Sequence, residues 1–253
     1  MPPTVSYQIM AVPERAEWAN ALAKKLRCGV TWDETRNVWD TGRRALLAHG
    51  DTDWHVVIQD DVLLSEHFTK TTIRQALAHV PEHTPVAFYT GAAARSRHPQ
   101  IVVAHKVAAE TGAGWVTYRG PVWGPAVAVP TADVEQIVNH GDRDISKGYD
   151  TKIMNAYRGI WRSDCWYTSP SLVDHRPVSE NPSAISASGR TADRRVLALG
   201  EPRDWTVTQS ADRAVLYPWV WMTDGRRTMH VRQGTHKHGR LVQKGWEQKE
   251  PAP

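Results

Sequence analysis

The sequence predicts an α/β fold in which helices flank a mostly parallel β-sheet. Over about the first ninety residues, short apolar segments rich in β-branched residues alternate with amphipathic segments at helical spacing. Strands that alternate with helices pair in parallel, because each helix returns the chain to the start of the next strand. Beyond residue 200 the segments are short and strand-like, which predicts a small antiparallel β extension. We therefore expect two domains, over residues 1–200 and 201–253.

The first three strands and three helices follow one another in order. Strands are expected at 5–12, 54–58 and 85–90, and helices at 16–26, 37–48 and from Ser65 to about residue 80. In the first helix Trp18, Leu22 and Leu26 recur every four residues and therefore share one face. Ser65 is the predicted N-cap of the third helix, because a serine hydroxyl accepts a hydrogen bond from an exposed backbone N–H.

The pattern is less regular after Gly91. Residues 92–99 are expected to form a mobile loop near the functional edge of the sheet. Further strands are predicted at 115–118, 122–129 and 166–168, and further helices at 132–139 and 149–158. Segment 177–195 is rich in Ser, Asn, Pro and Arg, which is typical of an irregular segment or one that orders on binding. In the extension, strands are expected at 206–208, 214–217, 219–222 and 228–231, with a hairpin turn at 224–225 and a disordered tail at 249–253.

Composition narrows the class of protein. No apolar stretch reaches the length of a membrane span, and the first residues lack a basic segment followed by an apolar run, so we expect a cytoplasmic protein. Cys28 and Cys165 lie in apolar or aromatic company and fit reduced, buried thiols. Walker-type, Gly-x-Gly-x-x-Gly and Gly-x-Ser-x-Gly patterns are missing from the sequence, so kinase, dehydrogenase and hydrolase functions lack support.

Charge and tryptophan content bear on the partner. The net charge is +4, and much of the excess lies late in the chain, in Arg226, Arg227, Arg232, Lys237, Arg240 and Lys244. Such a bias suits a nucleotide or a nucleic acid, and it also occurs without a particular partner. Twelve tryptophans are present, and flat aromatic rings pack cores as well as forming platforms for sugars or bases.

The strand predicted at 54–58 is followed by two adjacent carboxylates, Asp60 and Asp61. In open α/β sheets, ligands bind at the carboxyl ends of the strands. Carboxylates at that edge would be paired by a divalent cation that an anionic ligand also binds. The alternative is a strand followed by an Asp-rich turn, because Asp is a common turn residue.

Three stretches together resemble glycosyltransferases of the GT-A fold, in particular small bacterial and bacteriophage-encoded members. They are Pro13-Glu14-Arg15, Gln59-Asp60-Asp61, and Tyr149-Asp150 followed by Pro170-Ser171-Leu172-Val173-Asp174-His175. The resemblance covers residues 5–195. It implies a GT-A type, Rossmann-like sheet in the first domain and transfer of a hexosyl group from a nucleotide-sugar donor to a hydroxyl acceptor. For a bacteriophage-encoded member the location would be the host cytoplasm.

The resemblance also implies a metal site. In the family, an aspartate motif binds Mn²⁺ or Mg²⁺, which holds the diphosphate of the donor. Asp61 matches the metal-binding end of that motif and Asp60 its middle, whereas Gln59 departs from the acidic first position. His175 matches a histidine that reaches the same cation, although its residue type alone fits a surface or hydrogen-bonded histidine equally. Asp174 would support His175 from behind.

The remaining family roles concern the donor, the base and the acceptor. Pro13, Arg15, Gln59 and Asp60 match donor-binding positions, Trp123 and Gly124 match acceptor-site positions, and Arg176 is a further candidate for the phosphates. Asp150 matches the catalytic base, which would give transfer with inversion. From the residues alone, Asp150 also fits an N-cap, and Trp123 also fits a core position in a Val-rich strand.

Two other functions remain open on the sequence. A nucleotidyltransferase acting on a sugar phosphate would use the same strand-end carboxylates. A non-enzymatic protein would bind nucleic acid or glycan through the basic C-terminal extension. The segment 230–238 contains three histidines, but a basic solvated hairpin fits it better than a second metal site, because no third ligand at suitable spacing is present. The acceptor, whether a protein, a glycan or a modified nucleic acid, is left undetermined.

Overall fold

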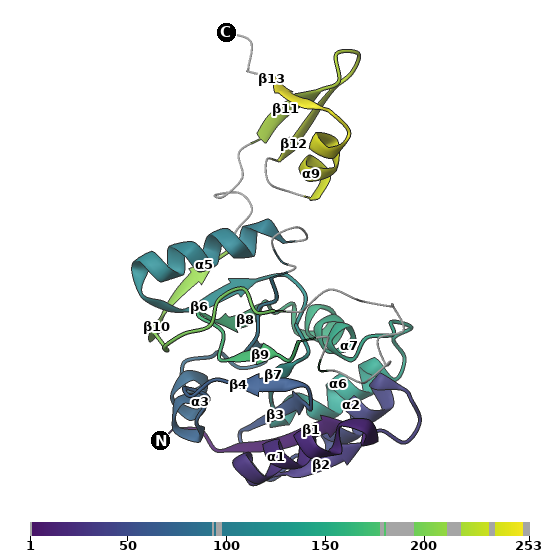
Figure 1. Ribbon diagram of the computed structural model, residues 1–253, viewed down its shortest axis with the longest axis vertical. Helices are drawn as coiled ribbons and strands as arrows, with labels where there is room; N and C mark the ends of the chain where they lie inside the picture. Colours follow the sequence, from purple (N-terminus) through teal and green to yellow (C-terminus); the bar gives the residue numbers. More distant parts are fainter. Residues whose placement is uncertain are drawn as a thin grey trace.

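An eight-stranded sheet forms the centre of the computed structural model (Figure 1), which describes residues 2–92, 94, 98–177, 180, 195–211, 219–232 and 236–249. The strands lie in the order β10 (Asp204–Ser210), β6 (Ala113–Tyr118), β8 (Cys165–Thr168), β5 (Val86–Ala87), β7 (Ala126–Pro130), β3 (Trp54–Gln59), β1 (Val5–Ala11) and β2 (Gly29–Trp32). β1 pairs in parallel with both β2 and β3, while β7 runs antiparallel to β3 and β5. Four of the seven pairings are parallel, which confirms the predicted α/β class with a mostly parallel sheet.

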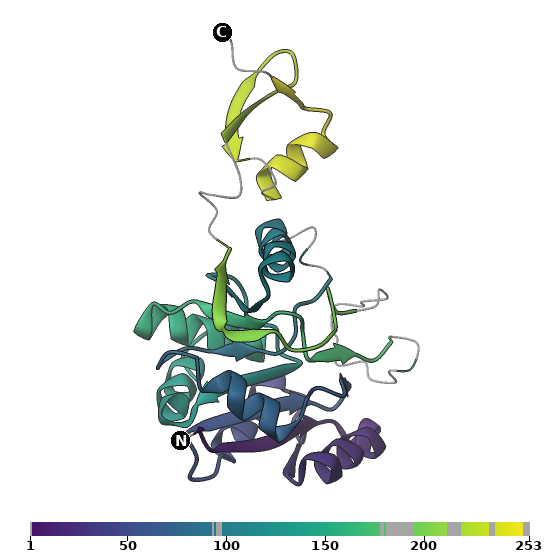
Figure 2. The same cartoon turned by 90° about the vertical axis from the view of Figure 1, so that its left-hand side faces the viewer.

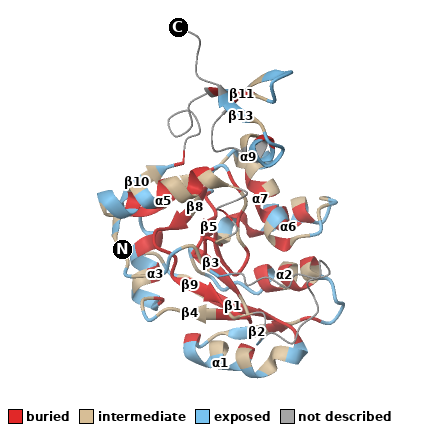
Figure 3. Ribbon diagram, turned by 45° about the horizontal axis from the view of Figure 1, so that its top comes forward, coloured by how far each residue is buried: buried red, intermediate tan, exposed pale blue. Residues whose placement is uncertain are grey.

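Apolar side chains fill both faces of this sheet. Along β3, Val56 and Ile58 belong to one core cluster and Val57 to the other, because successive side chains of a strand point to opposite faces. The first cluster includes residues of α1 (Ala16–Leu26) and α3 (Lys70–Leu77). The second includes residues of α2 (Val38–Leu47), α5 (Pro99–Thr111), α6 (Val134–Gly141) and α7 (Tyr149–Ala156). Figure 3 shows buried residues along the central strands and on parts of the helices around them.

Short elements complete the large domain. A 3-10 turn, η1 (Pro13–Arg15), follows β1; a second, η2 (Thr131–Asp133), precedes α6; and a π-helical turn, η3 (Tyr157–Trp161), extends α7. The helix predicted at 149–158 therefore continues to Trp161. β4 (Val62–Leu64) and β9 (Val173–His175) form a separate two-stranded antiparallel sheet.

The C-terminal strands form a small sheet of their own. β11 (Trp219–Thr223) and β12 (Thr228–Arg232) form the hairpin expected around Asp224-Gly225, and β13 (Glu247–Lys249) pairs on the other side of β11. A helix, α9 (His236–Gln243), covers this sheet through Leu241, which packs with Val220, Met222 and Val231. Figures 1 and 2 show this unit beyond α5, apart from the large sheet.

Several predicted elements differ from the structure. The N-cap of α3 is Thr69, whose hydroxyl accepts from the Thr72 N–H at 3.1 Å. Ser65 is not a cap, because its own N–H donates to Leu172 O in the approach to the β4–β9 pair. β10 pairs in parallel with β6, so residues 204–210 belong to the large sheet and not to the extension. Pro99 begins α5, at the end of the stretch expected to be a mobile loop.

Some expectations lie wholly or partly outside the described residues. They concern most of the segment 177–195, the strand at 214–217, residues 93 and 95–97 of the expected loop, and residues 250–253 of the tail. Lys249, the first residue of that tail, lies in β13. Cys28 and Cys165, both in described parts of the chain, are free thiols, and burial raises the pKa of Cys165 to about 12. Within the described residues, we find no helix with the length and apolar character needed to cross a bilayer.

We predict that Gly42→Ala lowers the free energy of unfolding by about 1–2 kcal/mol. A Cβ at Gly42 would lie 2.2 Å from Cδ2 of the buried Tyr149, where α2 meets the start of α7. Overpacking costs about 1–3 kcal/mol, of which a gain in helix propensity returns up to about 1 kcal/mol. Urea denaturation measures the change. Gly50→Ala is the control, since its Cβ would meet nothing closer than 3.8 Å. A Gly42→Ala variant as stable as the wild type would show that the Tyr149 ring moves aside at little energetic cost.

Candidate functional site

The parallel pairing of β1 and β3 brings two loops together at their carboxyl ends. Register pairs Met10 with Gln59, so η1 after β1 and the carboxylates after β3 lie side by side. Arg15 in η1 contacts both carboxylates. Its Nη2 lies 2.7 Å from Asp60 Oδ1, and its Nη1 lies 2.9 Å from Asp61 Oδ2. One guanidinium therefore compensates two adjacent negative charges that are almost entirely removed from solvent.

Asp60 is held by the backbone as well as by Arg15. Its Oδ2 accepts a hydrogen bond from the Val12 N–H at 2.8 Å, and its own N–H donates to Met10 O. The residue is fully buried. Burial raises the pKa of Asp60 to about 6, and the opposing effects of Arg15 and the Val12 N–H do not cancel it. Asp60 thus ties the end of β3 to the turn that follows β1.

His175 reaches Asp61 from a different part of the chain. The β4–β9 pairing puts Val62 opposite His175, and the Arg176 N–H donates to Asp61 O. His175 Nδ1 lies 3.5 Å from Asp61 Oδ2, and both side chains are buried. The ring of Tyr89 packs edge-on against the His175 ring, with centroids 5.6 Å apart. These contacts bring together residues that are 114 positions apart in the sequence.

Asp174 points away from this contact and supports the strand that carries His175. Its Oδ1 accepts from the backbone N–H groups of His175 and Val196, each at 2.8 Å. Its Oδ2 pairs with Arg195 Nη2 at 2.8 Å. Arg176, a candidate for the phosphates, instead stacks its guanidinium over the Trp18 ring, 4.4 Å from the centroid. Asp174 and Arg176 therefore hold β9 and the residue that follows it in place, and so support the position of His175.

The donors present fit a divalent cation that a substrate helps to bind. Among the residues that the structure describes, no three His, Cys, Asp or Glu side chains form a group of metal-ligand type. Asp61 Oδ2 and His175 Nδ1 are close enough to contact one ion, which gives two protein ligands. Mg²⁺ is commonly held by one or two carboxylates together with substrate phosphates. Arg15 already contacts Asp61, so a cation would share this carboxylate with a guanidinium.

A third carboxylate, Asp150, lies near Gln59, the residue that precedes the Asp pair. A Cβ on Gly124 would lie 3.0 Å from Gln59 Nε2 and 3.2 Å from Asp150 Cβ, so Gly124 lets these two side chains approach. Asp150 Oδ1 accepts from the Thr151 N–H at 2.8 Å. Asp150 is not the N-cap of α7, because Gly148 occupies that position. Burial raises the pKa of Asp150, against hydrogen bonds from the backbone of Thr151 and Gly124.

Trp123 and Pro13 lie at the margins of the site. Trp123 is partly buried against both core clusters, and its ring makes edge contacts with Tyr167 at 5.3 Å and His98 at 6.0 Å. Part of its surface therefore serves core packing, although Trp123 lies in the loop before β7 and not in a strand. Pro13 is exposed at the first position of η1, where its fixed φ starts the turn that carries Arg15.

The predicted residues thus converge, with some additions that the sequence did not single out. At the carboxyl end of β3, Arg15 contacts Asp60 and Asp61, and Asp61 contacts His175. Gln59, the residue before the Asp pair, lies close to Gly124, as does Asp150. Tyr89 and Arg195 were missed. Tyr89 lies at the end of a predicted strand, so its position at the sheet edge was available as a signal. Arg195 is the last residue of the segment predicted to be irregular, and the sequence offered no signal for it.

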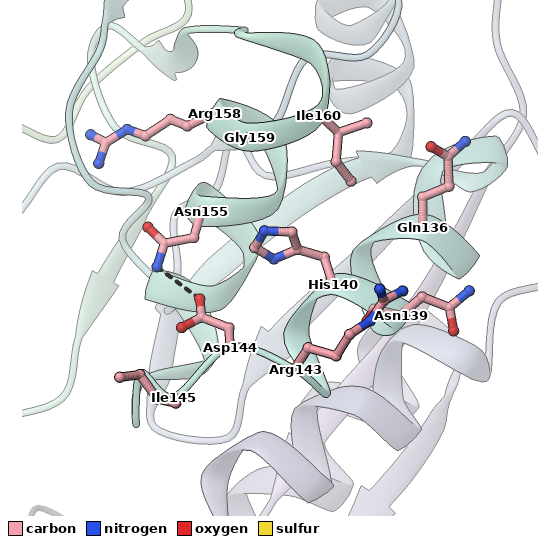
Figure 4. Close-up of a pocket in the computed structure, with 10 residues that line it drawn as sticks. All are labelled: Gln136, Asn139, His140, Arg143, Asp144, Ile145, Asn155, Arg158, Gly159 and Ile160. Atoms are coloured by element: carbon pink, nitrogen blue, oxygen red, sulfur yellow. Dashed lines mark hydrogen bonds between the residues drawn. The ribbon is translucent and has the colours of Figure 1, made fainter.

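A separate hollow of about 890 Å³ lies between α6, the loop after it, and the end of α7 with η3 (Figure 4). It is lined by polar and apolar side chains including His140, Asn155 and Ile160, and a 2.8 Å hydrogen bond joins Asn155 to Asp144 at its wall. The predicted site residues do not line this hollow. It is therefore distinct from the carboxylate site.

Comparison with known proteins does not establish a family. No protein-family model matches the sequence, and no curated protein matches it. Among solved structures, one similar chain is a mutant of the Drosophila beta-1,4-galactosyltransferase 7, in a complex with manganese, UDP-galactose and xylobiose. It is 11% identical, with a TM-score of 0.35, over 90% of this chain and 92% of the other. At that level of similarity, function has to be inferred from the geometry of the site itself.

We predict that Asp60→Asn is more stable than the wild type at neutral pH. A carboxyl whose pKa is raised on folding stabilises the fold below its unfolded pKa, and this contribution is lost as the pH rises through the folded pKa. For Asp60 the window runs from 3.8 to about 6, which corresponds to about 3 kcal/mol. The amide keeps an acceptor for the Val12 N–H and does not ionise.

Urea denaturation in EDTA, at about pH 5 and about pH 7.5, measures this difference. The advantage of Asp60→Asn should grow with pH, because unfolding releases the wild-type carboxyl to ionise in water. Asp51→Asn, at an exposed position before β3, is the control and should follow the wild type. A variant less stable than the wild type at the higher pH would show that the Arg15 ion pair outweighs the cost of burial.

Proposed function

We propose that the protein is a metal-dependent glycosyltransferase that transfers a sugar from a nucleotide-sugar donor to a hydroxyl acceptor with inversion. One observation carries the proposal. A largely buried group of Arg15, Asp60, Asp61 and His175 lies at the carboxyl edge of the sheet, and a third carboxylate, the half-buried Asp150, lies nearby. The group around Arg15 suits a diphosphate with its cation, and Asp150 suits a base for a hydroxyl.

The donor half of the site would be built on Asp61 and His175. These two residues would hold Mn²⁺ or Mg²⁺, and the bound cation would offset charge on the departing nucleoside diphosphate. Arg15 is positioned by Asp60 and presents a planar guanidinium, which suits phosphate oxygens. Pro13 would set the turn, and Gln59 would lie between the donor and the base.

The acceptor half of the site would be built on Asp150. A carboxyl with a raised pKa is a better match for taking a proton from a hydroxyl than an ordinary surface carboxyl. The Gly124 backbone donates to Asp150, so the strand entry at 122–126 fixes the direction of the carboxylate. Trp123, adjacent to Gly124 and only partly buried, would offer the rest of its ring to the acceptor sugar.

We predict that sugar nucleotides raise the melting temperature in the presence of Mn²⁺ and that Asp61→Asn abolishes this effect. A ligand that binds only the native state stabilises it by about 2.7 kcal/mol at a hundred times its Kd. The measurement is a thermal-shift panel of nucleoside diphosphates and sugar nucleotides, with Mn²⁺ or with EDTA. Asp51→Asn should retain the full shift. A shift of equal size in Asp61→Asn would exclude this residue as a cation ligand.

We predict that Asp150→Asn reduces kcat by about 10²–10⁴ while donor binding persists. The base must be ionised, so wild-type activity should fall as the pH drops through the raised pKa of Asp150. The measurements are a transfer assay with the donor found above, a pH–rate profile, and the thermal shift with that donor. Asp51→Asn should behave as the wild type. An Asp150→Asn variant with unchanged kcat would place the base elsewhere.

A nucleotidyltransferase is the second candidate, because strand-end carboxylates with a cation suit a nucleoside triphosphate as well as a sugar nucleotide. The two activities differ in their products. A nucleotidyltransferase releases pyrophosphate from a triphosphate in the presence of a sugar phosphate, whereas a glycosyltransferase releases a nucleoside mono- or diphosphate from a sugar nucleotide.

A further inference from the structure

Residues 219–249 form a unit with its own small core, here called the C-terminal module. Three strands in the order β12-β11-β13 carry Val220, Met222 and Val231, which are buried together with Leu241 of α9. Met229 and Trp246 pack against the edge of this core. The proposed transfer site uses no residue of the module, so the transfer reaction does not explain the composition of the module.

The module contains the whole positive excess of the chain. Between residues 219 and 249 there are seven Lys and Arg and two Asp and Glu, which gives a net charge of +5. The rest of the chain has 24 Lys and Arg and 25 Asp and Glu, a net charge of −1. Charge concentrated to this degree on one small unit attracts a polyanion to that unit and not to the large domain.

One face of the small sheet is covered by α9, and the other presents an aromatic residue. Val220 and Met222 point into the core, whereas Trp221 between them is 44% exposed. Successive side chains of a strand point to opposite faces, so Trp221 lies on the face opposite Val220 and Met222. The outer face therefore presents a partly exposed tryptophan ring.

The tip of the β11–β12 hairpin adds two exposed arginines. Asp224 Oδ1 accepts from the backbone N–H groups of Arg226 and Arg227 at 2.9 and 2.7 Å, which fixes the turn. Both arginine side chains are exposed, and Thr223 Oγ1 bonds to Arg227 O across the turn. Backbone hydrogen bonds hold the hairpin shape, so the two exposed arginines can meet an anionic ligand at the hairpin tip.

We propose that the C-terminal module binds single-stranded nucleic acid, with a base stacked on Trp221 and phosphates paired with Arg226 and Arg227. Exposed aromatic residues beside basic residues are the two elements of single-strand binding sites. The bases of a duplex are stacked inside it and cannot stack on Trp221. A single strand can stack a base on Trp221 and also pair its phosphates with the arginines. This inference does not depend on the transfer reaction.

The first test measures fluorescence anisotropy of a labelled single-stranded DNA of about 20 nucleotides with the full-length protein. We expect affinity to fall linearly on a log–log plot between about 50 and 300 mM NaCl, since each phosphate contact releases counterions. Arg226→Gln/Arg227→Gln should weaken binding and reduce the slope by about 1.4, at about 0.7 per contact. Lys24→Gln/Lys25→Gln removes the same charge from exposed positions of α1 and should leave the slope unchanged.

The second test concerns stacking. Trp221→Thr should weaken DNA binding by about 5- to 150-fold, the equivalent of one lost base stack, and Trp221→Tyr should restore most of it. Binding of inorganic polyphosphate, which has charge and no bases, should be unaffected by Trp221→Thr. Circular dichroism of both Trp221 variants checks that the module stays folded, so a loss of DNA binding with polyphosphate binding intact reports on stacking.

Several results would overturn the proposal. The first is an absence of DNA binding at about 50 mM NaCl, and the second is an equal loss of DNA affinity in the arginine and the lysine double variants. The third is tighter binding of duplex DNA than of the single strand. The fourth is full DNA affinity in Trp221→Thr. The last result, with polyphosphate binding intact, would indicate a purely electrostatic polyanion surface.

Discussion

The burial of two adjacent carboxylates at the end of β3 is the constraint on which the large domain depends. Removing an ionised carboxylate from water costs several kcal/mol unless a counter-charge and hydrogen bonds replace the solvent. Arg15 supplies the counter-charge to both residues, and the Val12 N–H supplies a hydrogen bond to Asp60. Both partners come from the connection between β1 and α1. The parallel β1–β3 pairing and its turn therefore have to form together with the carboxylate site.

The same constraint gives the two aspartates different tasks. Asp60 has no exposed surface and is committed to the backbone of Val12 as well as to Arg15, so it mainly positions the guanidinium. Asp61 shares one oxygen between Arg15 and His175 and retains slight exposure. A carboxylate with that surrounding can take part in binding a ligand without dismantling the fold. Sequence adjacency hides this difference, because the two residues are identical in type.

What the sequence could predict depended on the range of the interactions. β3 and its carboxylates were predictable because a short β-branched run and its end are local features. α5 was not, since Val102, Val103, Ala104 and Ala108 spread apolar character around the helix and obscure the period. The contact of Gln59 with Gly124 and Asp150 was equally hidden, because it needs β7 and α7 to be in place. The prediction of Ser65 as an N-cap was wrong, since the Ser65 N–H donates to Leu172 O next to the β4–β9 pair, before the helix begins.

The distribution of charge suggests how the two parts of the chain recruit ligands. With a net charge of −1 outside the module, the large domain offers no long-range attraction to an anionic donor. Under the proposed function, selectivity there has to come from contacts at short range, where Arg15 and the proposed cation would act in a largely buried, low-dielectric setting. The proposed binding by the module would follow the opposite principle, because exposed charges act at up to a Debye length of about 8–10 Å and are screened by salt. The two binding events should therefore differ in salt dependence, strong for the module and weak for the carboxylate site, even within one molecule.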